Sequence, residues 1–149
     1  MKSSEPQNIL WPQPKVLQLQ PFPMLVATSL KDAQDCYNAG VYSACAVMAG
    51  KSIEAVCLDK LGKPHNLHEG LQLLKTGKII DEMLYSWGDL LRKERNIGAH
   101  ANDQKTTKQD ADDVLQFAHA ICHYIYVLAR KQNEYLRRQL TKKARARTA

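Results

Sequence analysis

The segment RNIGAH, residues 95–100, places an arginine, an asparagine and a histidine within six positions. Histidine titrates near neutral pH and can take or give a proton, while a guanidinium fork can hold two phosphate oxygens as negative charge builds on them. Asn96 adds a neutral donor and acceptor. This set suits RNA cleavage without a metal, because the ribose 2′-OH supplies the nucleophile. We expect Arg95, Asn96 and His100 to form a catalytic site that needs no cofactor.

The helix that must position these residues is predicted from about Ile79 towards Gly98. Its apolar face is formed by Ile80, Met83, Leu84, Trp87, Leu90 and Leu91. At 100° per residue, Arg95 lies about 60° from Ile80, at the edge of the apolar stripe, and Glu94 lies about 40° to the other side, within it. The stripe therefore turns polar in its last turn.

The position of His100 depends on how this helix ends. A continuous helix would aim His100 away from Arg95, and Gly98 is predicted to end or bend the helix and so re-aim the imidazole. The structural alternative is that the helix leaves the core here and its side chains reach solvent, forming at most a weak ion pair.

Three further main helices and one short helix are predicted around this one. The first starts after Thr28 or Ser29 and ends at Gly40, and the second ends at Gly62 with Cys45, Met48, Ala49, Ile53, Val56 and Cys57 on one face. The short helix runs from about Asn66 to Lys75, and the long last helix starts near Asp110. No strand pattern competes, so we predict an all-α fold, a four-helix bundle with an additional short helix.

Composition divides the chain into three parts. Five of the six prolines lie in residues 1–23, which predicts an extended Pro-rich arm before a helical domain, residues 24–138. Residues 139–149 are predicted to be a basic, flexible tail. We expect basic side chains of this region to contact nucleic-acid phosphates, although they could equally belong to a solvated terminus: Arg138, Lys142, Lys143, Arg145 and Arg147.

Other motifs are set aside. GKS at residues 50–52 lacks the first glycine of a P-loop and falls within a predicted helix. His119, Cys122 and His123 have helical metal-ligand spacing, but nothing in the sequence clearly completes a site. The four cysteines form no CxxC pair, and neither a signal peptide nor a membrane span is expected, so we predict a cytoplasmic protein.

The segment R-N-x-x-A-H at the end of a bundle helix resembles the R-x4-H signature of the HEPN superfamily. An ordered series of further segments, CYNAGVYSACAVMAGKSIEAVC, NLHEGLQLL, LLRKERNIGAHA and DADDVLQFAHAICHYIYVL, resembles the HEPN-like domain-of-unknown-function family 4145. The resemblance covers roughly residues 21–130. It implies a HEPN-like four-helix bundle that often pairs as a homodimer, with the two R-x4-H motifs facing each other.

Active HEPN proteins are metal-independent endoribonucleases, often toxins or effectors of phage defence. The resemblance implies that Arg95 stabilises the transition state, His100 acts as acid or base, and Asn96 orients the substrate or the motif. Glu54 falls where relatives often carry an acid on the second helix, and Arg92 and Glu94, close to the motif, would support it.

Two functions follow as hypotheses. The first is a dimeric RNA-cleaving or RNA-binding protein of a bacterial defence or toxin-type system. The alternative is a non-catalytic dimerising or partner-binding module, associated with a restriction or defence enzyme, whose arm and last helix dock the partner. Nucleotide sensing in the same cleft is a third possibility that is consistent with arginine and histidine chemistry.

Overall fold

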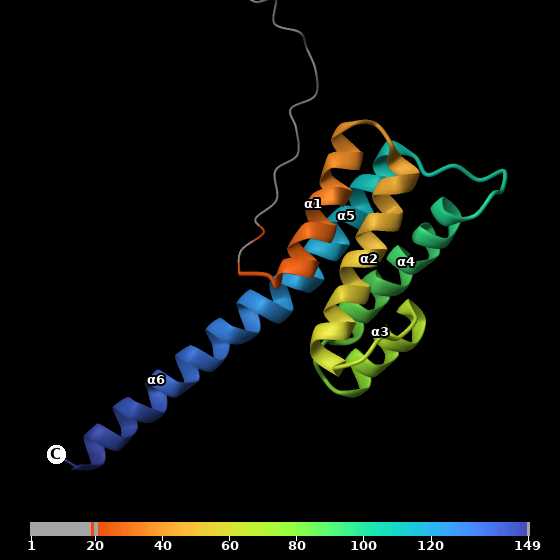
Figure 1. Ribbon diagram of the computed structural model, residues 1–149. Coiled ribbons are helices and arrows are strands. Elements are labelled where there is room, and N and C mark those ends of the chain that lie inside the picture. Colours follow the sequence, from red (N-terminus) through yellow and green to blue (C-terminus); the bar gives the residue numbers. More distant parts are fainter. Residues whose placement is uncertain (1–18, 20, 149) are drawn as a thin grey trace, which may run out of the picture.

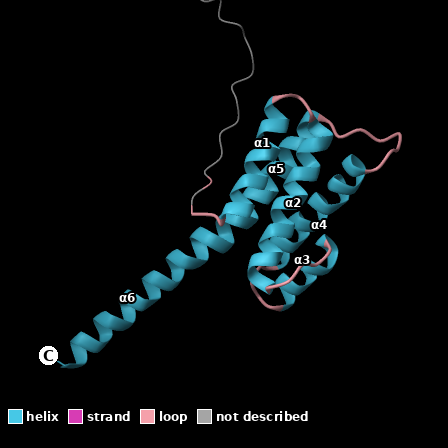
Figure 2. Cartoon of the chain, in the orientation of Figure 1, coloured by secondary structure: helices cyan, strands magenta, loops and turns pink. Residues whose placement is uncertain are grey.

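The computed structural model describes residue 19 and residues 21–148, and over these residues the chain is all-helical (Figures 1 and 2). The helices are α1 (Met24–Asn38), α2 (Tyr42–Leu61), α3 (Leu67–Thr76), α4 (Glu82–Ala99), α5 (Lys108–His123) and α6 (Ala129–Thr148), with a π-helical turn, η1 (Tyr124–Leu128), between the last two. The predicted helical fold class is confirmed.

Helices α1, α2, α4 and α5 pack side by side as a bundle, and the short helix α3 lies against α2 and α4 (Figure 1). Helix α2 is central, because it contacts α1, α3, α4 and α5. The predicted apolar face of α2 is confirmed, with Met48 partly buried and its other five members fully or almost fully buried. The largest fully buried side chains include Leu30, Ile53, Leu67, Leu71, Leu74, Leu91, Leu115 and Ile121.

Side-chain caps fix where three helices begin. The Asn66 side chain accepts from the Glu69 backbone at the start of α3, and Asp81 accepts from the Leu84 backbone at the start of α4. Thr107 and Asp110 form a capping box at the start of α5. The prediction that α4 starts near Ile79 is wrong by about three residues, because the cap at Asp81 begins the helix and residues 77–80 form the turn that ends α3.

Helix α1 starts earlier than predicted. It begins at Met24, directly after Pro23, and not after Thr28 or Ser29. Ser29 is buried within the helix, where its hydroxyl donates to the Leu25 carbonyl one turn earlier. The Ser29 hydroxyl therefore has its hydrogen-bond partner within α1, and Ser29 does not cap the helix.

Close helix contacts occur at glycines in helix interiors. A Cβ added at Gly98 of α4 would lie 2.7 Å from the Ser43 carbonyl oxygen of α2, and one at Gly88 would lie 2.6 Å from Leu71 of α3. Helix α4 ends at Ala99, one residue after Gly98, so Gly98 is its second-last residue and His100 is its C-cap. The function of Gly98 is to let α4 approach the backbone of α2.

The turn after α3 contains the one non-glycine residue with positive φ in the described part of the chain. Lys78 has φ 58°. The Lys78 and Ile79 backbone amides donate to the Lys75 and Leu74 carbonyls at 3.0 and 2.9 Å, the pattern of a Schellman motif, in which glycine usually occupies the left-handed position. A lysine therefore stands where a glycine would be less strained.

The last helix is longer than predicted. Helix α5 passes through η1 into α6 without a glycine or proline, so residues 139–148, predicted to be a flexible tail, lie in a helix (Figure 1). Alanine, arginine, lysine, glutamine and leucine favour helix strongly, and these residues dominate this segment. None of the residues of α6 is buried. Leu128, at the end of η1, is 47% exposed.

The predicted arm, residues 1–23, lies mostly outside the described residues. Its described end includes Phe22, which is buried and packs edge to face on His119, with ring centroids 5.8 Å apart. No helix in residues 21–148 is both long and apolar enough to cross a membrane.

Candidate functional site

Arg95 contacts the central helix of the bundle. Its Nη2 lies 3.3 Å from Glu54 Oε1 of α2, an ion pair that joins α4 to α2. The Arg95 side chain is 27% exposed and that of Glu54 is 40% exposed, so this pair lies at the surface of the bundle. Arg95 Nε is buried, and none of the described groups accepts a hydrogen bond from it.

Gly50 makes room for this arginine. It is buried one helical turn before Glu54, and a Cβ added there would lie 2.6 Å from Arg95 Cγ. The aliphatic part of Arg95 therefore packs over the backbone of α2 while the guanidinium reaches Glu54.

The buried face of α4 is shifted from the predicted stripe. Leu84, Gly88 and Leu91 are buried, while Met83 and Leu90, predicted to belong to the apolar face, are 63% and 49% exposed. The shift is towards Arg95 and away from the Glu94 side. Arg95 therefore belongs to the face that contacts α2, whereas Glu94 forms no ion pair or hydrogen bond with the described residues.

Arg92 is held within its own helix. Its Nε and Nη2 both donate to Asp89 Oδ1, at 3.0 and 2.9 Å. Lys93 Nζ lies 3.3 Å from the other Asp89 oxygen. These contacts, the Arg92 hydrogen bonds above all, hold the pKa of Asp89 below its ordinary value. Arg92 supports α4 near the motif and does not contact Arg95 through any of these bonds.

His100 follows the last turn of α4. It has an extended backbone, with φ −117° and ψ 145°, and it is exposed. Asn102, which sequence analysis missed, closes the helix end: its side-chain amide donates to the Ile97 and His100 carbonyls at 3.1 and 2.8 Å, and its oxygen accepts from the Gln104 backbone. An asparagine three residues after the last helical residue is the signal that could have identified this turn.

The structure brings Arg95 and Glu54 together but does not join Arg95 to His100. Within the described residues, no hydrogen bond or ion pair links the side chains of Arg95, Asn96 and His100. Asn96 is partly buried beside Arg95 in the sequence of α4. In one chain, the motif is therefore an arginine fixed on the bundle surface with a histidine exposed beyond the helix end.

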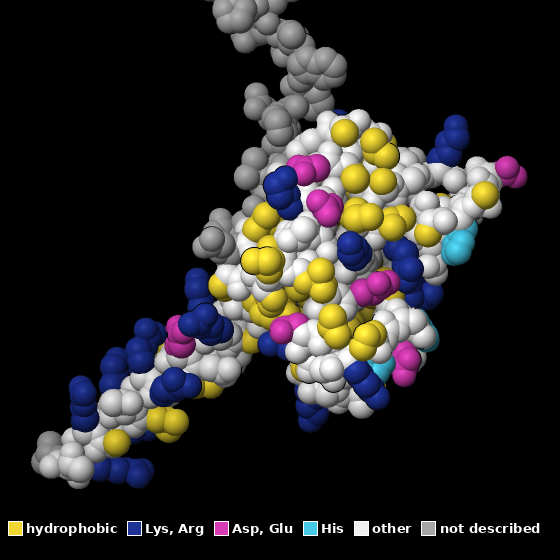
Figure 3. Space-filling model, in the orientation of Figure 1, with side chains coloured by type: hydrophobic (Ala, Val, Ile, Leu, Met, Phe, Trp, Pro, Cys, Tyr) yellow, Lys and Arg dark blue, Asp and Glu magenta, His cyan; other side chains and the backbone are white. Residues whose placement is uncertain are grey.

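The basic side chains of α6 lie towards the opposite end of the bundle from His100. The loop with His100 leads directly into α5, and α6 leaves the bundle beyond the other end of α5 (Figure 1). Helix α5 has 16 residues, so the two ends are about 24 Å apart. Figure 3 shows Lys and Arg side chains along α6, where Arg138, Lys142, Lys143, Arg145 and Arg147 are all exposed.

Other reactive groups are not arranged for catalysis. Gly50, Lys51 and Ser52 lie inside α2, which confirms that GKS is not a phosphate-binding loop. The four cysteines are free thiols, and burial raises the pKa of Cys45 and of Cys57 to about 12. In residues 21–148 no group of three or more His, Cys, Asp or Glu side chains is placed to hold a metal ion.

Comparison with known families identifies one match. A family model described as "Domain of unknown function (DUF4145)" matches residues 31–142, which span α1 to α6 and include Glu54 and the whole RNIGAH segment. Comparisons with curated proteins and with solved structures found no match.

Proposed function

The chain belongs to the DUF4145 family, a domain of unknown function. From the residues of its candidate site, we propose that the protein is a metal-independent endoribonuclease. The protein acts as a HEPN-type homodimer in the cytoplasm of a bacterium, as part of a defence or toxin-type system. Arg95 and His100 are its catalytic residues, Asn96 orients the substrate, and Glu54 positions Arg95.

The observation that supports this proposal most is the Glu54–Arg95 ion pair. An acid from α2 holds an arginine from the end of α4 at a partly exposed position, with Gly50 leaving room for its side chain. Only one of the guanidinium nitrogens is engaged by Glu54, and the fork has five donors in all. Because Nε is buried, the donors that can bind phosphate oxygens are the remaining ones on Nη1 and Nη2.

The reaction that suits these groups is transesterification of the RNA backbone. The 2′-oxygen attacks phosphorus, the P–O2′ bond forms and the P–O5′ bond breaks, which yields a 2′,3′-cyclic phosphate and a 5′-hydroxyl end. A base takes the 2′-OH proton and an acid gives a proton to O5′. An imidazole can fill either role near neutral pH, and the Arg95 guanidinium stabilises the charge on the phosphorane oxygens.

A two-fold dimer supplies what one chain lacks. His100 is exposed beyond the end of α4 and is not bonded to Arg95 in the same chain. In an isologous interface the same patch of both subunits meets across the axis, so Arg95 of one chain and His100 of the second copy can share one phosphate.

The test is cleavage of a mixed RNA pool in EDTA by the full chain and by His100→Ala and Arg95→Ala. Loss of a general acid or base should slow cleavage by about 10²–10⁴-fold, and loss of the guanidinium by about 10²–10³-fold. Denaturing gels give the rate, and resistance of the 3′ ends to ligation, relieved by phosphatase treatment that opens cyclic phosphates, identifies the product.

Matched controls separate site effects from loss of charge or fold. Lys93→Ala removes a positive charge from an exposed position of α4, and His68→Ala removes an exposed histidine from α3. Both should cleave at the wild-type rate. Cleavage that persists unchanged in Arg95→Ala and His100→Ala would show that the active groups lie elsewhere.

A second candidate function is a non-catalytic dimerising or partner-binding module for a restriction or defence protein. The exposed apolar side chains of α6 favour it, since Tyr135, Leu136 and Leu140 are 52%, 50% and 67% exposed. Under this alternative the Arg95–Glu54 ion pair only joins α4 to α2 and takes no part in catalysis.

The two candidates predict different variants to fail. If the module function holds, Leu136→Ala with Leu140→Ala should abolish capture of the partner protein, whereas His100→Ala should not affect it. Deletion of residues 1–18 tests the arm, and it must stop before Phe22, which packs on the core side of α5. Cleavage by the wild type that His100→Ala abolishes would rule out this alternative.

A further inference from the structure

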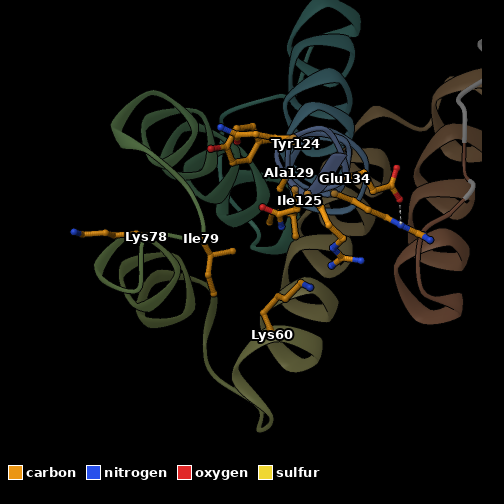
Figure 4. A pocket seen from close by; sticks show the side chains of 11 residues that line it. Lys60, Lys78, Ile79, Tyr124, Ile125, Ala129 and Glu134 are labelled. Carbon is orange, nitrogen blue, oxygen red and sulfur yellow. Dashed lines mark hydrogen bonds and ion pairs between the residues drawn. The ribbon is translucent and has the colours of Figure 1, made fainter. Parts of the chain in front are cut away.

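A cavity of about 650 Å³ lies where α6 leaves the bundle (Figure 4). Its walls come from the end of α2, the turn between α3 and α4, the π-helical turn η1 and the first half of α6. The lining residues are Lys60, Lys78, Ile79, Tyr124, Ile125, Ala129, Arg130, Gln132, Asn133, Glu134 and Arg137. This volume lies within the range of small-ligand sites.

The charges around this cavity are strongly unbalanced. Four cations line it, and Glu134 is the one carboxylate among its lining residues. Arg130 Nε is paired with Glu134 at 3.2 Å, and Lys60 lies over the Tyr126 ring and 4.0 Å from Asp59. Within the described residues, Lys78 and Arg137 pair with no carboxylate. Their positive charges remain available for an anion.

Lys78, at the rim of this cavity, has a strained backbone conformation. It occupies the left-handed position of the Schellman motif, with φ 58°, where glycine is the usual residue. In Figure 4 its side chain points outward from the rim, on a different side from Lys60. Its rotatable four-carbon stem can swing the ammonium over the mouth. A lysine at a strained backbone position beside a cavity with unpaired cations favours a role in binding.

Apolar and aromatic side chains also line the cavity. Tyr124 and Ile125 come from η1 and Ala129 from α6, while Ile79 lies beside Lys78 in the turn between α3 and α4 (Figure 4). π-helical turns within α-helices often occur at functional sites. Gln132 and Asn133 add amide donors and acceptors. Cations beside an aromatic ring and amides are the combination by which proteins hold single nucleic-acid strands.

We propose that this cavity binds one nucleotide unit of a single-stranded RNA, with its phosphate on Lys78 and Arg137 and its base against Tyr124. It is a second RNA contact, separated from RNIGAH by the length of the bundle, and the choice of RNA over other nucleoside phosphates rests on the proposed function. A strand held here by one chain can extend along the basic face of α6.

The test measures binding of a fluorescein-labelled, 2′-O-methylated RNA of mixed sequence by fluorescence anisotropy. This RNA lacks the 2′-hydroxyl nucleophile, so binding is measured independently of cleavage. Arg137→Ala and Lys78→Gly should each weaken binding about tenfold, the loss expected for one charge-assisted contact. Arg137→Ala should also lower the slope of log affinity against log salt by about one.

Lys131→Ala is the matched charge control. Lys131 lies on α6, one residue from Arg130, but does not line the cavity. Its removal should change affinity at most about twofold, since an exposed charge acts through screening solvent. Equal losses in Lys131→Ala and Arg137→Ala would show that the net charge of α6 binds RNA, and would overturn the assignment of the cavity.

Lys78→Gly also separates binding from folding, because its two effects have opposite directions. Glycine adopts the left-handed conformation without strain, so the variant should melt about 2–4 °C higher while binding RNA more weakly. Wild-type affinity in Lys78→Gly would overturn the proposal.

A titration with adenosine monophosphate distinguishes a free nucleotide from an RNA strand. If the monophosphate binds in an Arg137-dependent manner and RNA fails to displace it, the cavity serves a free nucleotide and the RNA assignment is wrong. RNA binding that depends on Arg137 in a protein that cleaves nothing would overturn only the proposed nuclease function. Intact cleavage with binding insensitive to Arg137 and Lys78 would overturn only this inference.

Discussion

Arg92 and Arg95 lie three positions apart on α4 and are held in different ways. Arg92 binds Asp89 of its own helix, while Arg95 crosses to Glu54 of α2. The first contact can form as soon as the helix forms, whereas the second requires α2 and α4 to be packed. The contact of Arg95 therefore forms only in the assembled bundle. A catalytic side chain must be fixed in this way by packed elements of the fold.

The Asp89 carboxyl offers a pH measurement of the local contact. Its pKa is below its ordinary value, first because Arg92 donates hydrogen bonds to it and then because Lys93 lies nearby. A lowered folded-state pKa adds stability above the unfolded value of about 3.9, and this contribution is lost as the pH falls below it. In Arg92→Ala the pKa of Asp89 should rise towards its ordinary value, as followed by carbon-detected NMR titration of the carboxyl group.

Lys93→Ala provides the comparison for this titration. Its effect on the pKa of Asp89 should be smaller, because Lys93 contributes less than Arg92 to the shift. An unchanged Asp89 titration in Arg92→Ala would mean that the two side chains do not hold the paired geometry in solution.

At this scale, residue types predict chemistry better than they predict contacts. The Arg, Asn and His of RNIGAH could be selected from their chemistry, and Glu54 from the resemblance, but the Arg95–Glu54 contact depends on how α2 and α4 pack. The helical-wheel angles misplaced the buried face of α4, because a wheel has no information on which neighbour each side meets. Lys78 and Arg137 lie far apart in sequence, so no local pattern could pair them.

At the scale of secondary-structure elements, the close packing of α2 against α4 depends on two glycines. Gly50 and Gly98 lie at two points of this contact, and each lets atoms of the other helix approach its backbone. At Gly50 the neighbour is the flexible side chain of Arg95, whereas at Gly98 it is the Ser43 backbone carbonyl, which cannot move aside. Gly98 is therefore the less replaceable of the two.

Gly98→Ala tests this difference, because two effects oppose each other. Alanine favours a helix interior over glycine by about 1 kcal/mol. The overlap with the Ser43 carbonyl should cost about 1–3 kcal/mol, so we expect net destabilisation of about 1 kcal/mol by urea denaturation. Ser86→Ala, at an exposed position of α4, is the control and should change stability by less than about 0.5 kcal/mol. A more stable Gly98→Ala protein would contradict the close approach of the two helices.

Helix ends were predictable wherever the stop signal was local. Gly40, Gly62 and Gly77 follow the ends of α1, α2 and α3 within one or two residues, as the sequence indicates. The starts of α1 and α4 were less predictable, because Ser29 bonds back to its own helix and the Schellman turn uses Ile79 and Ile80 before Asp81 caps α4. The sequence predicts the long last helix but not its continuation over residues 139–148, because a dense run of basic residues is also typical of a flexible segment.

In the whole molecule, the basic helix α6 and the candidate catalytic motif RNIGAH lie far apart. Eight basic side chains and Glu134 give α6 a net charge of +7, which leaves about −1 for the rest of the chain. The RNIGAH motif lies at the far end of α5 from α6 (Figure 1). The basic helix of one chain therefore does not lead RNA to the RNIGAH motif of the same chain, and RNA bound by both would have to span the bundle.

Removal of residues 139–149 tests this division of roles. None of α6 is buried, so the free energy of unfolding should change by less than about 0.5 kcal/mol. RNA affinity should fall, and the salt slope should become less steep by up to about three, since four basic residues are lost. The cleavage rate at saturating RNA should stay unchanged while KM rises. A truncated protein that unfolds at lower urea would show that α6 packs on the bundle.

The conformation of α6 would also be coupled to any polyanion that binds this helix. A helix of 20 residues without tertiary packing is only marginally stable in water, and its eight positive charges repel one another. A polyanion that binds the helical form more tightly than the coil shifts the helix–coil equilibrium by the ratio of the two affinities. The order of this helix would thus be thermodynamically linked to any polyanion that it binds, so that a bound RNA would act both as a ligand of α6 and as a part of its folding free energy.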